Sequence, residues 1–162
     1  MIQGFLVHLL LIVVYLALTA DVSFINIAFA AIVAFGVLYV FGMASGGVGV
    51  GGYAARVAGL CGFVVYFIRI LIVANLQVAY EILTPGYGMS PRLVGYSVAG
   101  LSDVQITWLA NSITLTPGTL SVDLDDDRDL LYIHAMYGED REALIAELDE
   151  LKERLLRGVF GE

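Results

Sequence analysis

The first 55 residues carry a single formal charge, and this restricts the chain to structures that a lipid bilayer can hold. That charge is Asp21, which separates two apolar runs at residues 2–20 and 22–41. Each run is about 20 residues long, and a helix of that length, at ~1.5 Å per residue, crosses a bilayer core of ~30 Å. We therefore expect a transmembrane helical hairpin at residues 1–42, with Asp21 or Ser23 capping its second helix.

The remaining charge lies almost entirely in the C-terminal part of the chain. The net formal charge is −1 over residues 1–55, +2 over 56–100 and −9 over 101–162. An acidic C-terminal part excludes nucleic acid as a partner, because phosphates are bound by Lys and Arg. The one cysteine, Cys61, lies in an apolar run and has no second cysteine to pair with, so we expect a packing or lipid-facing residue.

A glycine-rich linker at residues 43–52 precedes a third long apolar segment at residues 53–84. This segment contains no proline before Pro85 and is expected to form one long helix. Small and polar residues recur at steps of three or four along it and predict a partner-contact face, made of Arg56, Gly59, Gly62, Tyr66, Arg69 and Gln77. The opposite face, which includes Phe67 and Ala74, is expected to meet lipid. The sequence leaves open whether this helix spans the membrane or lies at its interface.

Residues 90–162 predict a small α+β domain with the element order β-α-β-β-α. The expected strands are 93–98, 119–124 and 130–137, and the expected helices are 104–113, capped by Asp103, and a last helix that Asp140 opens. Leucines at 144, 148, 151 and 155 form the apolar stripe of the last helix. The fold class is therefore membrane α plus α+β.

No constellation of residues in this chain indicates catalysis, a cofactor or a metal. Asp125, Asp127 and Asp129 match the first ligands of a calcium-binding EF-hand loop, but Leu130 stands where the loop needs glycine, so we interpret them as a polar hairpin turn. The two histidines lie far apart in the sequence, without cysteines or acids at zinc-ligand spacing. We expect no enzyme, no cofactor and no metal site.

The membrane segments also lack the ionisable residues of a proton pathway. The two N-terminal runs hold His8 near one end and Asp21 at the other, and Arg69 in the third segment does not deprotonate readily. We expect His8 to have a packing or surface role near the membrane interface. A chain of this kind needs partner subunits in order to move ions.

The run at residues 108–120, WLANSITLTPGTL, is long and distinctive. Together with Val122-Asp123, the polar turn and the later Leu131-Tyr132-Ile133-His134, it resembles the E subunits of the Mrp (Mnh) type multisubunit monovalent cation/proton antiporters. The chain's whole plan, a hairpin, a long helix and a small domain, is similar as well. The family-like turn is expected to be structural rather than catalytic, and its residues are Asn111, Thr114, Thr116, Pro117, Gly118 and Thr119.

The resemblance implies an accessory subunit in a bacterial or archaeal cell membrane. Its partners are then the other membrane subunits of a complex that exchanges Na⁺ or K⁺ for protons, and its C-terminal domain is cytoplasmic. Arg56 and Arg92, each placed after a membrane segment, agree with that orientation, because cytoplasmic flanks carry the excess of positive charge.

Two other function classes are weighed against this one. In the first, the chain is a membrane-tethered sensor whose acidic domain binds a cation or a protein and regulates a transporter. It predicts saturable binding of divalent cations. In the second, the chain is a membrane enzyme, which the missing nucleophile and metal ligands disfavour.

Overall fold

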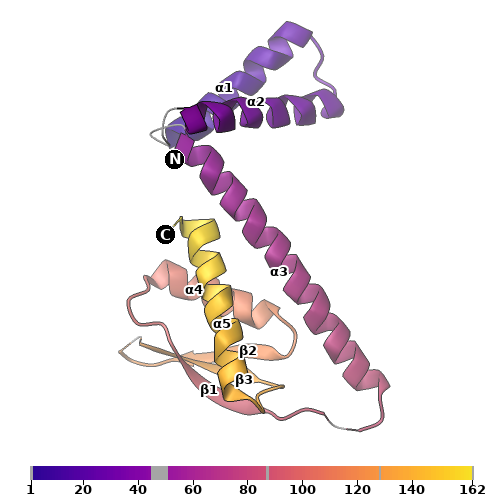
Figure 1. The fold of residues 1–162 in the computed structure, drawn as a ribbon, viewed down its shortest axis with the longest axis vertical. Coiled ribbons are helices and arrows are strands. Elements are labelled where there is room, and N and C mark those ends of the chain that lie inside the picture. The colour runs from indigo at the N-terminus through magenta and orange to yellow at the C-terminus, as the bar shows by residue number, and fades with distance from the viewer. Residues whose placement is uncertain (1, 45–50, 87, 128, 162) are drawn as a thin grey trace. The chain divides into compact units, whose positions relative to one another are not determined.

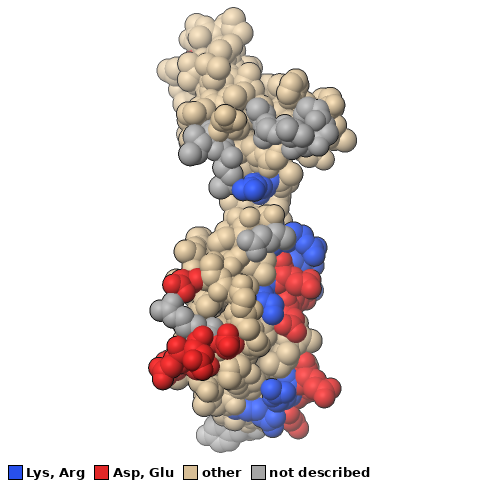
Figure 2. Space-filling model, turned by 90° about the vertical axis from the view of Figure 1, so that its left-hand side faces the viewer, with Lys and Arg blue, Asp and Glu red and all other residues tan. Residues whose placement is uncertain are grey.

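The computed structural model describes residues 2–44, 51–86, 88–127 and 129–161, and it is mostly helical with one small sheet (Figure 1). The chain divides into two compact units, Met1–Cys61 and Gly62–Glu162, so the boundary falls inside the third helix. Of the predicted linker at residues 43–52, positions 45–50 lie outside the described residues. Figure 2 shows one face of the molecule, where the coloured charged atoms gather on the C-terminal unit.

The N-terminal unit contains α1 (Ile2–Thr19), α2 (Phe24–Ala44) and the beginning of α3 (Gly51–Leu83). The stretches Phe24–Ala44 and Gly52–Leu83 are long and apolar enough to cross a membrane, and α1 is a shorter apolar helix. Small residues let α2 pack closely, since Ala30, Ala34 and Gly42 are all buried.

Polar side chains close the turn between α1 and α2, as the sequence predicts. The Asp21 carboxylate accepts the Ser23 backbone N–H at 2.8 Å, and the Ser23 hydroxyl accepts the Asn26 backbone N–H at 3.4 Å. Ser23 is thus the residue that caps α2, with Asp21 holding it in place. Ala20 takes φ 50°, the left-handed conformation in which many helices end.

The C-terminal unit contains β1 (Arg92–Ser97), α4 (Asp103–Leu115), β2 (Thr119–Leu124), β3 (Leu130–Ala135), α5 (Arg141–Leu155) and a short π-helical turn, Leu156–Phe160. The element order is the one that the sequence predicts. The sheet is antiparallel in the order β1-β3-β2, so the β2–β3 hairpin places β3 in the centre. A register shift between Ser121 and Asp123 interrupts the β2–β3 ladder.

One apolar core joins the sheet to both helices. The buried residues of β1 and β3 alternate along the strands, and they form one cluster with the leucine stripe of α5 and with Ile106, Leu109 and Ile113 of α4. Both helices therefore cover the same face of the sheet. On its other face Leu93, Leu120 and Val122 stay exposed.

The cap of α4 differs from the prediction. Ser102, and not Asp103, is the capping residue: its hydroxyl accepts the Gln105 backbone N–H at 3.4 Å, and the Gln105 side chain accepts the Ser102 backbone N–H at 2.8 Å. This reciprocal pair is a capping box, which places Asp103 in the first turn, where its negative charge favours the helix dipole. At α5 the predicted Asp140 is the cap, and its carboxylate accepts the N–H groups of Glu142 and Ala143.

Candidate functional site

The part of α3 that belongs to the C-terminal unit packs against that unit's core. Phe63 is buried in the core cluster, and Tyr66, Phe67 and Ile70 pack on it. These residues recur at steps of three and four, so they lie on one side of the helix. Phe67 thus contacts this chain's own domain rather than the lipid expected from the sequence, because periodicity alone does not reveal which side of a helix a later domain will cover.

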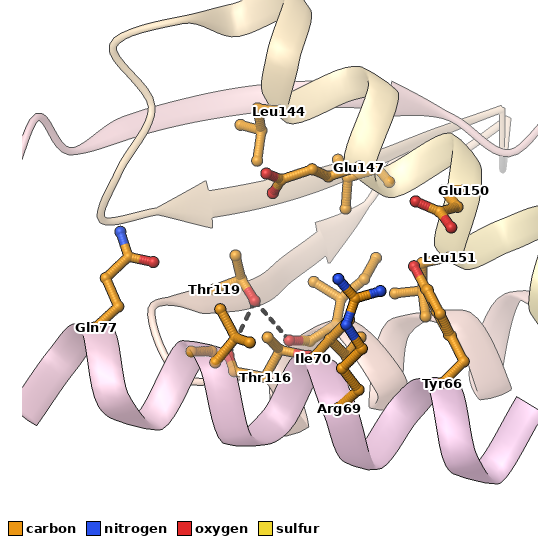
Figure 3. Close-up of a pocket in the computed structure, with 14 residues that line it drawn as sticks. Tyr66, Arg69, Ile70, Gln77, Thr116, Thr119, Leu144, Glu147, Glu150 and Leu151 are labelled. Atoms are coloured by element: carbon orange, nitrogen blue, oxygen red, sulfur yellow. Dashed lines mark hydrogen bonds between the residues drawn. The ribbon is translucent and has the colours of Figure 1, made fainter.

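A cleft of about 300 Å³ lies along this part of α3 (Figure 3). We call it the α3–α5 cleft. Its walls come from α3, from α5, and from the turn between α4 and β2. The side chains that carry its chemistry are Tyr66, Arg69, Gln77, Thr116, Thr119 and Glu147. Ile70, Val73 and Ala74 give the α3 wall an apolar portion beside these polar groups.

Two charges of opposite sign point into the α3–α5 cleft without meeting. Figure 3 shows the Arg69 guanidinium directed from α3 toward α5, and the Glu147 carboxylate extending sideways from α5, above Thr119 in this view; both residues line the cleft. Neither group forms an ion pair or a hydrogen bond with any other residue that the structure describes. Glu150 differs, since it pairs with Arg154 at 3.2 Å, and Arg154 in turn lies 4.9 Å from the ring centre of Tyr66. The cleft therefore holds one unpaired cation and one unpaired anion.

The surroundings of Glu147 disfavour its charged form. Burial by the cleft walls raises the pKa of this carboxyl, and the negative charge of Glu150 raises it further. Part of the side chain remains exposed.

The predicted partner-contact face falls into two groups in the structure. Tyr66, Arg69 and Gln77 line the cleft against this chain's own α5, whereas Arg56 and Gly62 are exposed and Gly59 is half-buried. No described atom lies within 4 Å of a Cβ built on Gly62, so this position is open to another molecule. The side of α3 that points away from the domain is apolar and exposed, and its residues are Val65, Ile68, Ile72 and Leu76.

The family-like turn has the structural geometry that the sequence predicts. Helix α4 ends at Leu115 before Pro117, and Gly118 takes φ +91°. The Thr119 hydroxyl donates to the Ile113 carbonyl at 2.7 Å and lies 3.0 Å from the Thr116 carbonyl, so it ties the strand to the end of the helix. These bonds are the dashed lines in Figure 3.

The other residues of this run support the same turn. The Thr114 hydroxyl accepts the Ser121 backbone N–H at 3.1 Å, while Asn111 is exposed on α4.

His8 has well-defined neighbours within the N-terminal unit. Its Nε2–H donates to the Ala31 carbonyl at 3.0 Å, and its Nδ1 lies 2.9 Å from the Tyr53 hydroxyl. A carbonyl only accepts, so the neutral ring carries its proton on Nε2 and accepts from Tyr53 through Nδ1. Gly4 allows this arrangement, because a Cβ there would clash with the Cβ of Tyr53. His8 thus joins the three helices of this unit.

The acidic turn and His134 do not come together as a ligand set. The Asp125 carboxylate accepts the backbone N–H groups of Asp129 and Leu130 at 2.8 and 2.9 Å, which accounts for its place in a hairpin turn. His134 is exposed on β3. Among the described residues, no group of three or more His, Cys, Asp or Glu side chains is arranged to hold a metal ion.

The structure combines an apolar helical unit, a long apolar helix with the length and composition of a membrane span, and a small α+β unit. The family model for a Na⁺/H⁺ ion antiporter subunit, MNHE, matches residues 8–159. The chain belongs to this family, the E subunits of Mrp-type Na⁺/H⁺ antiporters.

Relatives from bacteria are named as E subunits of Na⁺/H⁺ antiporters. The chain is 41% identical over 93 residues to the E subunit of the Na⁺/H⁺ antiporter from Bacillus subtilis, covering 57% of this chain and 59% of the relative. It is 33% identical over 104 residues to the E subunit of the antiporter from Alkalihalophilus pseudofirmus, covering 64% and 66%. The matches thus span about three fifths to two thirds of the relatives' length.

Two solved structures are similar as well. A chain of the Mrp complex from Dietzia is 27% identical with a TM-score of 0.49, covering 61% of this chain and 94% of the other. A chain of the membrane-bound sulfane sulfur reductase, an archaeal respiratory membrane complex, is 32% identical with a TM-score of 0.47, covering 85% of each chain.

Sequence reasoning finds Tyr66, Arg69 and Gln77 but not Glu147, which faces them across the cleft. The available signal is the position of Glu147 next to the leucine stripe of α5, beside Leu148 and three residues after Leu144. An acid at the edge of an apolar stripe lies close to whatever covers the stripe. The sequence does not show that α3 is that neighbour.

Proposed function

We propose that this chain is an accessory subunit of a Na⁺(K⁺)/H⁺ antiporter complex, which supports assembly and forms no part of the ion path. Membership of the family of antiporter E subunits supports the antiporter context. The observation that carries the accessory role is the absence of any Asp, Glu, Lys or Arg from α1 and α2. Ion pathways through a membrane use such residues at depth.

His8 does not replace them in this proposal. Both of its ring nitrogens are engaged, one by the Ala31 carbonyl and one by the Tyr53 hydroxyl. A relay residue has to release and rebind its proton, whereas a ring held at both nitrogens is suited to fixing helices against one another. We therefore assign His8 a packing role.

Partner subunits contact part of the apolar surface that the chain leaves open, and lipid covers the rest. The outward side of α3 exposes apolar side chains, and so does the uncovered face of the sheet, with Leu93, Leu120 and Val122. Such surfaces mark contact with protein or membrane. Together with Gly62, which permits close helix approach, they form the proposed contact region for the other membrane subunits of the complex.

The C-terminal unit is proposed to lie in the cytoplasm, with the α1–α2 hairpin in the cell membrane. Arg56 and Arg92 follow membrane segments, whereas the turn at Asp21 carries no base. A cysteine label near residue 160, read in intact cells with Cys61 replaced by serine, reports the side directly. Labelling by an impermeant reagent from outside would contradict this orientation.

Deletion of this chain from the co-expressed complex tests the accessory role. We expect the other subunits to be recovered in smaller amounts after mild detergent extraction, with antiport falling in proportion to the complex that remains. The sensor alternative predicts full assembly and saturable binding of divalent cations to the purified full chain. Loss of antiport per assembled complex would contradict our proposal.

A further inference from the structure

We propose that the α3–α5 cleft binds the headgroup of a zwitterionic phospholipid, with its phosphate at Arg69 and its primary ammonium at Glu147. This inference goes beyond the subunit's part in antiport and requires only that the chain lie in a membrane. The ligand class follows from three features of the C-terminal unit: the separated charges, the polar groups between them, and the apolar surface beside them.

The charges define the two ends of the ligand. Arg69 offers a guanidinium that fits phosphate oxygens, and Glu147 offers a carboxylate that accepts from an ammonium group. Both groups point into the cleft and remain unpaired with any residue in the described part of the chain (Figure 3). The nearby bases of α5 are already engaged, since Lys152 pairs with Asp149 and Arg154 pairs with Glu150. A ligand with only one charge would leave the other unsatisfied.

The space between the charges suits a small polar group. The cleft holds about 300 Å³, at the lower end of the volumes that small-molecule sites provide. Gln77 lines it with an amide group. The Thr116 and Thr119 hydroxyls line it as well, and because they donate their hydrogens to the carbonyls of Ser112 and Ile113, they offer oxygens that accept. Burial raises the pKa of Glu147, so a cation placed beside this carboxylate would relieve an existing cost.

The surface around the cleft indicates that the ligand is a lipid rather than a free solute. Ile70, Val73 and Ala74 form the apolar part of the cleft wall, and they continue onto a helix whose outer side is also apolar. On that outer side Val65 is 69% exposed and Leu76 is 65% exposed. A helix with an apolar outer side and charged groups on its flank has the character of one at a membrane interface, where acyl chains and headgroups meet. A purely apolar helix from another subunit would leave both Arg69 and Glu147 without partners.

The proposal is tested by native mass spectrometry of the purified, delipidated full chain with three lipids of equal acyl chains. Phosphatidylethanolamine supplies phosphate and a primary ammonium, phosphatidylcholine supplies phosphate and an ammonium without N–H groups, and phosphatidylglycerol supplies phosphate alone. We expect phosphatidylethanolamine to bind about tenfold more tightly than the other two, the difference that one charge-assisted hydrogen-bonded group makes. Equal retention of all three lipids would overturn the proposal.

Two variants separate the roles of the charges. Glu147→Gln should lower binding of phosphatidylethanolamine to the level of phosphatidylglycerol, whereas Arg69→Gln should weaken all three lipids, because all carry phosphate. The matched controls are Glu153→Gln and Arg157→Gln, which remove an exposed pair near the end of α5 that lies outside the cleft. Circular dichroism confirms that each variant is folded. Unchanged lipid selectivity in folded Glu147→Gln would contradict the assignment.

A final arm distinguishes the lipid from its free headgroup and from a protein occupant. Soluble phosphoethanolamine should fail to displace the bound lipid at equal concentration, since it lacks the chains that contact α3. Displacement at equal concentration would assign the site to a soluble phosphate ester and overturn the proposal that a lipid binds there. Recovery of the intact complex with another subunit cross-linked to residue 147 and no lipid bound would likewise overturn it.

Discussion

At the residue scale, Gly118 shows why the turn between α4 and β2 needs its particular sequence. Its φ of +91° belongs to the left-handed region, and a Cβ there would lie 3.4 Å from the Tyr137 ring. A β-branched side chain meets both the backbone strain and the crowding. The turn then loses the geometry that lets Thr119 bond the end of α4.

We therefore expect Gly118→Val to lower the free energy of unfolding of the C-terminal unit by about 1 kcal/mol or more. Chemical denaturation of the full chain in detergent measures this loss. Gly95→Ala is the control, because a Cβ at Gly95 would lie at an ordinary 3.7 Å from Tyr132. A Gly118→Val variant that assembles fully and yet abolishes transport would give the turn a direct functional role and contradict us.

Two carboxyls of α5 respond to pH in opposite directions. The Tyr96 hydroxyl donates to Asp149 at 2.6 Å, and this bond, helped by Lys152 and opposed by burial, lowers the pKa of Asp149. A carboxyl whose pKa is lower in the folded state gives stability that is present above its unfolded pKa of about 4 and is lost as pH falls through its folded pKa. Glu147 has the opposite effect, because its pKa is raised in the folded state. The stability that this carboxyl contributes is complete below about pH 4 and is lost as pH rises through its folded pKa.

We therefore expect the Asp149→Asn variant to lose less stability than the unmodified chain when the pH falls below about 4. Glu147→Gln should instead raise the melting temperature at pH 7, while its difference from the unmodified chain disappears toward about pH 4. Thermal unfolding of the full chain between about pH 3 and 8 distinguishes the two. Parallel melting curves for all three proteins would mean that neither carboxyl is linked to folding.

At the scale of elements, α3 accounts for most of what the sequence does not predict. Its length and its end before Thr84-Pro85-Gly86 follow from an uninterrupted apolar run and the residues that stop it. The side that meets the domain does not follow, because the spacing of small and polar residues defines a contact face without showing whether a partner or this chain's own domain covers it. Periodicity alone directs Phe67 toward lipid, yet this residue packs on the core, which is formed by residues that come later in the chain.

Gly62 provides the sharpest test of the contact region on α3. No described atom approaches a Cβ at this position, so Gly62→Leu should leave the chain's own fold intact. We expect it to reduce co-purification of the other antiporter subunits by occupying the space of a close helix contact. Leu71→Ala, on the opposite side of the helix, is the control and should have a smaller effect. Equal effects would remove Gly62 from the contact region.

The small domain is the most predictable part of the chain. The leucine stripe of α5 reflects a single buried face, and the structure has this helix as expected. Strand β2 also forms where the alternation in residues 119–124 predicts it, but Leu120 and Val122 are exposed, whereas Thr119 and Ser121 are the more buried positions. The sequence misplaces the cap of α4 by one position, because Ser102 and Asp103 are both good caps and only the partner Gln105 decides between them. The α3–α5 cleft is not predictable, because it depends on how far apart two helices pack.

At the scale of the whole molecule, the central question is the difference between carrying ions and holding a complex together. The charge-free α1 and α2 and the doubly bonded His8 ring favour the second role. His8 is the residue on which the two roles make opposite predictions, because an imidazole is the side chain in α1 and α2 that could pass a proton on. Gln keeps hydrogen-bonding groups at this position but does not titrate.

The most direct measurement is therefore antiport by the intact complex carrying His8→Gln, recorded per assembled complex in everted membrane vesicles. We predict a rate within about twofold of the unmodified complex, because a tenfold change in rate corresponds to about 1.36 kcal/mol and a packing residue alters no barrier of the ion path. The abundance of each subunit, measured on the same vesicles, corrects for any loss of assembly. A large loss of antiport with normal assembly would place His8, and with it this chain, on the proton pathway.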